Sequence, residues 1–132
     1  MKRWIWVGSA DVAAYHAELI AEHGGSAGVR DRGLLESALA RPQNLAAYGE
    51  PSVSDLAAAY AFGIAKKHPF VDGNKRVAFV ASITFLELNA WQFAATEEQA
   101  AMAFLELAGG KMTEQEVSRW LEANSRKAAR KR

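Results

Sequence analysis

The sequence predicts an all-α domain. Apolar residues recur at helical spacing in most segments, and these segments are separated by glycine, proline and helix-capping residues. Short extended runs are expected at Trp4–Val7 and Trp91–Phe93. The chain has 132 residues, and half of them are hydrophobic, which is ordinary for a globular domain that buries one core. We therefore expect a single domain over residues 1–132, with five or six helices around one central buried helix.

Two helices are expected in the first third of the chain. The first covers residues 9–23, with Ser9 as its cap, and it ends at Gly24-Gly25-Ser26. The second is shorter and covers residues 32–40, with Asp31 as its cap. Pro42 follows it, because proline cannot continue a helix without losing a hydrogen bond. Residues 43–53 are then expected to form a polar loop.

The middle of the chain predicts a pair of helices joined by a short loop. Ser54 is expected to cap a helix over residues 55–66, which Pro69 stops because the residue before a proline is disfavoured in helical conformation. Residues 74–88 are apolar on nearly every side, so this helix is expected at the centre of the core.

The last third predicts two more helices and a basic end. Residues 97–108 form one helix, which Gly109-Gly110 ends. Thr113–Glu116 has the pattern of a capping box and begins a helix that runs to about Arg126. Residues 126–132 carry five basic side chains and no acid, and we expect them to be a flexible, solvated tail. Since no aromatic residue interrupts this tail, direct binding to nucleic acid is not expected.

Composition excludes several classes of protein. The chain has no cysteine, so disulfides, thiolate zinc sites and thiol catalysis are absent. Its first residues lack the apolar core and cleavage site of a signal peptide. No stretch is apolar for long enough to span a membrane, so a cytoplasmic location is expected.

The nine residues His68–Arg76, with the sequence HPFVDGNKR, carry most of the functional information. The predicted helix after this loop presents unpaired backbone N–H groups and a positive dipole end. Gly73 allows a positive φ angle, and Asn74 can donate from its amide. Lys75 and Arg76 place two cations at this helix start, where each is locally unfavourable by a few tenths of a kcal/mol. A bound anion would make their interaction energy favourable instead. The loop therefore predicts a phosphate site.

Two further side chains of the loop suit phosphate chemistry. His68 can accept a proton from an attacking hydroxyl, and Asp72 offers a hard oxygen to Mg²⁺. Each residue alone also fits an ordinary Asp-Gly turn with a histidine cap, but the whole set in this order favours the phosphate site. The motifs GxxxxGK[ST] and GxGxxG are absent. The remaining histidines, His16 and His23, are expected at solvated positions of the first helix.

HPFVDGNKR resembles the signature of the Fic/Doc superfamily. Fic proteins carry HPFx[D/E]GNGRxxR, and death-on-curing (Doc) toxins carry HxFx[D/N][A/G]NKR. Residues 28–42 also resemble the family's upstream segment. The resemblance implies His68 as the base for a target hydroxyl, Phe70 as the buried aromatic that fixes the loop, Asp72 as the acidic residue associated with Mg²⁺, Gly73 and Asn74 as the anion cradle, and Arg76 as the arginine that grips nucleotide phosphate.

Two departures from the Fic pattern bear on the reaction. Lys75 replaces a glycine that AMP-transferring Fic enzymes have, and Phe79 replaces their second arginine. Doc-type toxins share both changes. They resemble kinases that move the terminal phosphate of ATP or another nucleoside triphosphate, with Mg²⁺, to a threonine of elongation factor Tu, and so arrest translation. The resemblance therefore favours a phosphotransferase, with AMP transfer or a non-catalytic nucleotide-binding or partner-binding module as alternatives.

The resemblance also implies regulation by a partner, a cognate Phd-like antitoxin. Residues 118–124 are similar to the SxxxE[G/N] inhibitory helix of self-restrained Fic proteins. In those proteins the glutamate pairs with the second Fic arginine, and Phe79 stands at that position here. We therefore expect residues 118–124 to be an ordinary face of the last helix.

Overall fold

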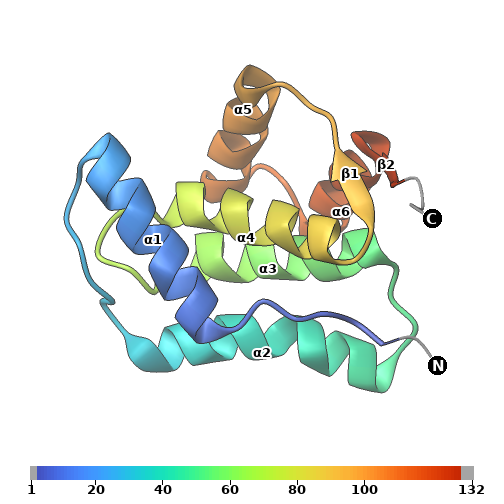
Figure 1. The fold of residues 1–132 in the computed structure, drawn as a ribbon, viewed down its shortest axis with the longest axis horizontal. Coiled ribbons are helices and arrows are strands. Elements are labelled where there is room, and N and C mark those ends of the chain that lie inside the picture. Colours follow the sequence, from blue (N-terminus) through green and yellow to red (C-terminus); the bar gives the residue numbers. More distant parts are fainter. Residues whose placement is uncertain (1–2, 129–132) are drawn as a thin grey trace.

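The computed structural model describes residues 3–128 and confirms the all-α fold (Figure 1). Within this range there are six helices and one two-stranded antiparallel sheet. Their bounds in chain order are α1 Ser9–His23, α2 Arg32–Tyr48, α3 Val53–Lys67, α4 Asn74–Leu88, β1 Trp91–Phe93, α5 Glu97–Ala108, α6 Glu114–Ala123 and β2 Ser125–Lys127. No helix in the described range is both long enough and apolar enough to traverse a lipid bilayer.

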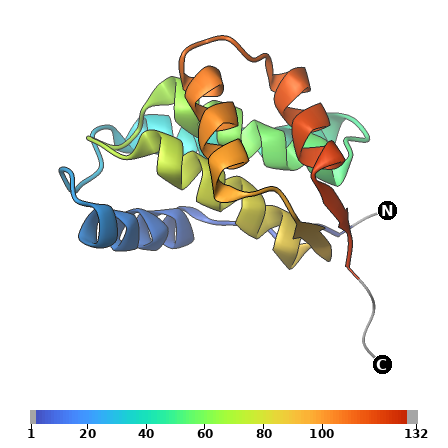
Figure 2. The ribbon, with the colours of Figure 1, turned by 90° about the horizontal axis from the view of Figure 1, so that it is seen from above.

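The central helix is α3, and α4 lies along it. Eleven of the fifteen residues of α3 are buried, and they cover nearly its whole circumference. Many of them are alanines, which let α2, α4 and α6 approach closely. By contrast, α4 buries seven residues, because one side faces α3 while others face α1, β1 and α5. Figure 2 shows α1 and the α5–α6 pair on opposite sides of α4. The expectation that residues 74–88 occupy the very centre was therefore wrong.

The second helix is longer than predicted, since α2 runs to Tyr48 with Pro42 inside it. Pro42 is buried, and Leu45 and Ala46 pack against the core one turn later. The apolar face that begins at Leu35 thus continues past the proline. Packing of this face outweighs the one missing hydrogen bond, so most of the predicted polar loop at 43–53 is helical.

Three helix ends also differ from the predictions. Gly8, not Ser9, is the N-cap of α1, and Ser52, not Ser54, is the N-cap of α3. The last helix ends at Ala123 because the Asn124 side chain donates to the carbonyl of Trp120, at 2.8 Å, and the chain then enters β2.

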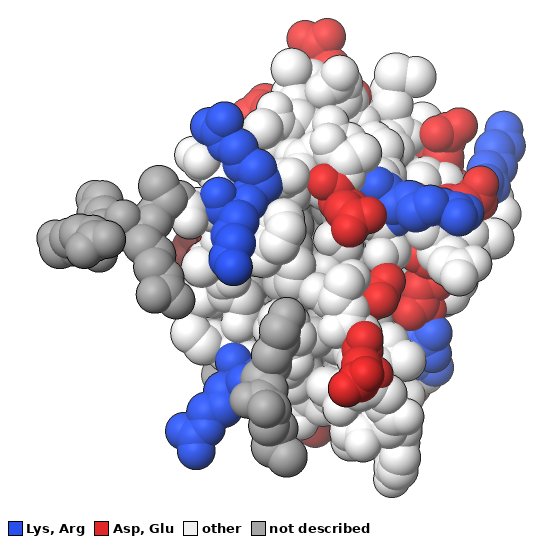
Figure 3. Space-filling model, turned by 90° about the vertical axis from the view of Figure 1, so that its right-hand side faces the viewer, with Lys and Arg blue, Asp and Glu red and all other residues white. Residues whose placement is uncertain are grey.

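Strand β2 includes part of the predicted basic tail. It pairs with β1 in antiparallel register, with Gln92 opposite Arg126 and Trp91 opposite Lys127. Arg126 and Lys127 are therefore ordered, contrary to expectation, and residues 129–132 lie outside the described part of the chain. Figure 3 views the molecule from the side of these strands and shows basic side chains interspersed with acidic ones.

Candidate functional site

The loop between α3 and α4, residues 68–73, is held in place by the segment before α2. The backbone N–H groups of Arg30 and Asp31 donate to the carbonyl of Pro69, at 2.7 and 3.0 Å. The N–H of Val71 donates to the carbonyl of Gly28, at 3.1 Å. Residues 28–31 therefore brace the loop through backbone contacts. They belong to the segment 28–42 that resembles the upstream segment of the family.

His68 has an unusual backbone conformation, with φ 50° and ψ 58°. This left-handed region is uncommon for residues other than glycine. Arg30 spans the turn with its guanidinium, because Nε donates to the carbonyl of His68, at 2.8 Å, and Nη2 to that of Lys67, at 3.0 Å. The imidazole of His68 is exposed at the end of α3, where a substrate can reach it.

His16 lies beneath the loop, and the sequence reasoning missed it. It is 3% exposed, and its ring stacks on that of buried Phe70, with centroids 3.9 Å apart and planes inclined by 12°. Its Nε2 lies 2.7 Å from the carbonyl oxygen of Asp72. The expectation of a solvated position was wrong. His16 lies four residues after Val12 and four before Ile20, so helical spacing already placed it on the apolar face of α1.

The side chain of Asn74 holds the loop and does not open toward a ligand. Its Oδ1 accepts from the backbone N–H of Phe70, and its Nδ2 donates to the Phe70 carbonyl, both at 3.0 Å. Nδ2 also lies 3.5 Å from Nδ1 of His68. Asn74 therefore ties the two ends of the loop together, and what it offers an anion is its backbone N–H.

The first turn of α4 has the geometry that an anion site needs. Gly73 is the N-cap, with φ 76°, and its N–H donates to Asp72 Oδ1, at 2.9 Å. Val77 is the first residue whose N–H bonds back into this turn, to the Gly73 carbonyl. The N–H groups of residues 74–76 precede it and have no acceptor within the helix. Such a terminus binds phosphate through N–H donors and the helix dipole.

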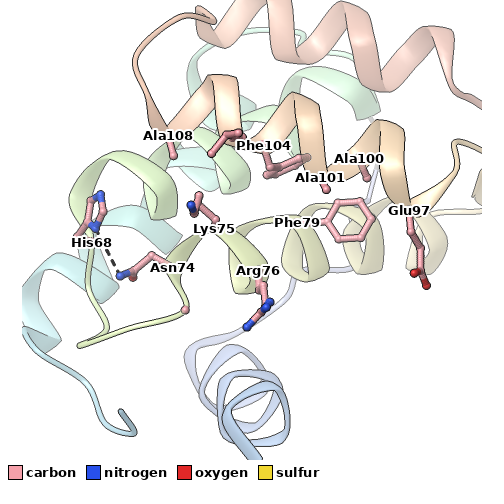
Figure 4. A pocket seen from close by; sticks show the side chains of 12 residues that line it. His68, Asn74, Lys75, Arg76, Phe79, Glu97, Ala100, Ala101, Phe104 and Ala108 are labelled. Atoms are coloured by element: carbon pink, nitrogen blue, oxygen red, sulfur yellow. Dashed lines mark hydrogen bonds between the residues drawn. The ribbon is translucent and has the colours of Figure 1, made fainter. Parts of the chain in front are cut away.

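A groove of about 680 Å³ runs from this turn along α5 (Figure 4). At one end are His68, Gly73, Asn74, Lys75 and Arg76, so five of the seven predicted site residues line it. The rest of the lining is mostly apolar and consists of Phe79, Glu97, Ala100, Ala101, Phe104, Leu105 and Ala108. In Figure 4, Lys75 projects toward α5, whereas Arg76 projects toward the α1 side of the turn.

Phe79 forms part of the groove wall and is not fully buried. Its ring packs edge-on against Phe104 and Phe93, with centroids 5.2 and 5.7 Å apart. This aromatic contact occupies the position where the Fic pattern has a second arginine. The positive charge of the groove is therefore concentrated at the His68 end.

Asp72 is exposed, but its carboxylate is turned away from the groove. One oxygen accepts from Gly73 N–H, and the other accepts from Ser26 N–H, at 3.3 Å. No group of three or more metal-ligating side chains occurs within residues 3–128. Since Mg²⁺ needs only one or two carboxylates beside nucleotide phosphates, a Mg²⁺ site at Asp72 stays a prediction.

None of residues 118–124 lines the groove. The Ser118 hydroxyl donates to Asp55, at 2.7 Å, on the side of α6 that faces α3. Glu122 lines a separate cavity, together with Arg3 and Lys127. This placement agrees with an ordinary face of the last helix.

Comparison with known proteins matches this sequence to a family. A sequence model described as the Fic/DOC family matches residues 6–86, which include both the loop and the segment that braces it. The chain belongs to the Fic/DOC family. The matched part ends before α5, so the second wall of the groove lies outside the Fic/DOC match.

A curated protein is similar to part of this chain. Toxin Doc of Mycolicibacterium smegmatis (strain ATCC 700084 / mc(2)155) is 49% identical over 75 residues. The similar part covers 54% of this chain and 57% of that protein. The chain thus matches a little over half the length of that relative.

Proposed function

We propose that the protein is the toxin of a toxin-antitoxin pair and transfers the terminal phosphate of a nucleoside triphosphate to a protein hydroxyl. Fic/DOC proteins transfer nucleotide-derived groups to proteins, and the similar curated protein is named Toxin Doc. The observation that favours transfer of the terminal phosphate over transfer of AMP is the position of Lys75. Its side chain projects into the groove from the anion-binding turn, beside His68.

The position of Lys75 favours phosphate transfer over AMP transfer. A glycine there would leave space beside the first turn of α4 for the α-phosphate of a nucleotide. The lysine fills part of that space and supplies positive charge instead. Phosphoryl transfer depends mainly on positioning and on stabilising the charge of the transferred group, which a cation beside backbone N–H donors provides.

The proposed transfer uses His68, Lys75 and the first turn of α4. The imidazole of His68 accepts the proton of the target hydroxyl while the hydroxyl oxygen bonds to the terminal phosphorus of the nucleotide. The bond from that phosphorus to the nucleoside diphosphate breaks, and the diphosphate leaves. The N–H groups of residues 74–76 and the ammonium of Lys75 stabilise the charge on the transferred group. No step depends on an ion held by Asp72, whose carboxylate faces Ser26.

The target and the partner follow from family resemblance. A threonine of elongation factor Tu is the proposed acceptor, and its phosphorylation would arrest translation. A Phd-like antitoxin is the proposed inhibitor. The apolar part of the groove between α4 and α5 supports a protein ligand, since peptide segments commonly dock in apolar grooves.

Intact mass spectrometry of elongation factor Tu tests the reaction. The factor is incubated with the protein, ATP and Mg²⁺, and His68→Ala serves as the inactive variant. We expect a phosphate increment with wild type and none with His68→Ala. His23→Ala, which removes an exposed histidine of α1, should retain the full increment.

The alternatives give different masses. An AMP increment would instead establish AMP transfer. If ATP binds but no increment appears, and His68→Ala still arrests growth on expression, the protein is a binding module and the proposed reaction is wrong.

A further inference from the structure

His16 has a place in the site that the proposed reaction does not use. It is the buried histidine of the chain, whereas His23 and His68 are exposed. A buried polar side chain needs a hydrogen-bond partner, and His16 has one in the backbone of the loop. The contact joins residues 56 positions apart and falls on the peptide unit directly before the anion-binding turn.

The hydrogen bond between His16 and Asp72 has a defined direction. A backbone carbonyl oxygen can only accept, so Nε2 of His16 must carry the hydrogen. The distance of 2.7 Å is at the short end of the ordinary range for a nitrogen donor and an oxygen acceptor. The structure therefore assigns the Nε2–H form to His16 and aims the Asp72 carbonyl at α1.

The Asp72–Gly73 peptide has an alternative orientation that would harm the anion site. Glycine adopts φ angles of either sign at little cost, so Gly73 permits this peptide to flip. Figure 4 shows α1 on the opposite side of the turn from α5 and the groove. A flip would turn the carbonyl oxygen away from α1 and toward the side where phosphate binds, bringing partial negative charge next to an anion.

We propose that His16 is a positioning residue that locks the Asp72–Gly73 peptide with its carbonyl directed away from the bound phosphate. The inference rests on the proposed function, because it takes the first turn of α4 as the site for nucleotide phosphate. His16 acts in two ways, since its Nε2–H holds the carbonyl and its ring supports Phe70 from below. Its ring also lies against Gly73, where an added Cβ would be 3.6 Å from Nε2.

Two substitutions separate the hydrogen bond from the packing. His16→Phe keeps an aromatic ring against Phe70 but removes the donor. His16→Gln keeps an amide N–H donor at similar reach but removes the ring. His23→Gln is the matched control, because it removes a histidine from the same helix at an exposed position. ATP binding is measured by isothermal titration calorimetry, and the thermal midpoint of each variant is recorded.

We expect His16→Phe to bind ATP about tenfold more weakly than wild type, as for loss of one hydrogen bond that orients the site, with little change in thermal midpoint. His16→Gln should restore most of the affinity despite its poorer packing, and His23→Gln should match wild type. Wild-type affinity in His16→Phe would overturn the inference, and so would affinity in His16→Gln as weak as in His16→Phe.

The imidazole nitrogens provide a second measurement should His16→Phe fail to fold. ¹⁵N NMR of wild type should show His16 protonated at Nε2, and a neutral ring protonated at Nδ1 would overturn the inference. Failure of the proposed function looks different. ATP binding that depends on His16 without phosphate transfer contradicts the reaction alone, whereas a wild type that binds no ATP contradicts both.

Discussion

The Asn74 side chain turns back onto the loop that precedes α4. Its amide satisfies both the N–H and the carbonyl of Phe70, which is 1% exposed. Asn74 itself is 6% exposed, so water has little access to these groups. Buried backbone groups without partners cost about 1–3 kcal/mol each. The residue thus contributes to the stability of the loop.

Asn74→Ala should therefore lower the free energy of unfolding by about 1–3 kcal/mol, because the Phe70 backbone loses its partners. Urea denaturation measures the change. Lys75→Ala is the neighbouring control, since Lys75 is exposed, and its stability should stay within about 0.5 kcal/mol of wild type while ATP binding weakens. An Asn74→Ala variant as stable as wild type would contradict the clamp.

The sequence predicted five of the residues that line the groove but not how each side chain is oriented. His68, Gly73 and Lys75 are near one another in sequence, so a single loop brings them together. The direction of the Asp72 carboxylate depends on Ser26, and the place of His16 depends on how α1 packs. Both contacts join residues more than forty positions apart, which local pattern and spacing do not specify.

Among the helices, α3 and α6 are joined through one carboxylate. Asp55 accepts from the backbone N–H of Ser52, at 3.0 Å, and from the hydroxyl of Ser118, at 2.7 Å. Burial alone would raise the pKa of Asp55, but these hydrogen bonds outweigh it and leave the pKa below its ordinary value. The ionised form is therefore favoured in the folded protein.

Asp55→Asn should destabilise the protein at neutral pH by about 1–2 kcal/mol, because it weakens the cap of α3 and the bond to α6. A lowered folded-state pKa contributes stability above the unfolded pKa of about 4, and this contribution is lost as pH falls through the folded-state pKa. The difference between wild type and variant should thus shrink between pH 7 and pH 3 in urea denaturation.

Asp11→Asn is the matched control for Asp55. Asp11 has the same position in the first turn of α1, where it accepts from Gly8 N–H, but it is exposed. We expect a smaller loss of stability than for Asp55→Asn. A difference for Asp55→Asn that stays constant down to pH 3 would contradict the assignment.

The ends of two helices were predicted correctly from the sequence. The predicted bounds of α4 and α5 match the structure, because the Asp-Gly turn, Asn89 and the Gly109-Gly110 pair act locally. The predicted ends before Pro42 and near Arg126 were wrong. Core packing continues α2 past the proline, and the Asn124 side chain ends α6 at Ala123, after which residues 125–127 pair with β1.

Across the whole molecule, the N-terminal segment is attached to the core at the middle of α3. The Tyr60 hydroxyl accepts from the N–H of Val7, at 2.9 Å, and donates to its carbonyl, at 3.1 Å. The rings of Trp6 and Tyr60 both contact Phe85 of α4, with centroids 5.6 and 5.2 Å away. One tyrosine thus links the N-terminal segment, α3 and α4, so its loss should weaken the whole fold and not one helix.

Tyr60→Phe keeps the ring but removes both hydrogen bonds, so we expect a loss of about 1–3 kcal/mol at pH 7 from the unsatisfied Val7 backbone. Burial raises the pKa of Tyr60 to about 12. A raised folded-state pKa contributes stability that is complete below the unfolded pKa of about 10 and is lost as pH rises through 12. Denaturation across this alkaline range should therefore show the stability of wild type falling toward that of Tyr60→Phe.

Tyr48→Phe is the control, at a tyrosine that is 90% exposed, and its stability should match that of wild type at every pH. Equal stability of Tyr60→Phe and wild type at pH 7 would show that Tyr60 does not hold the N-terminal segment.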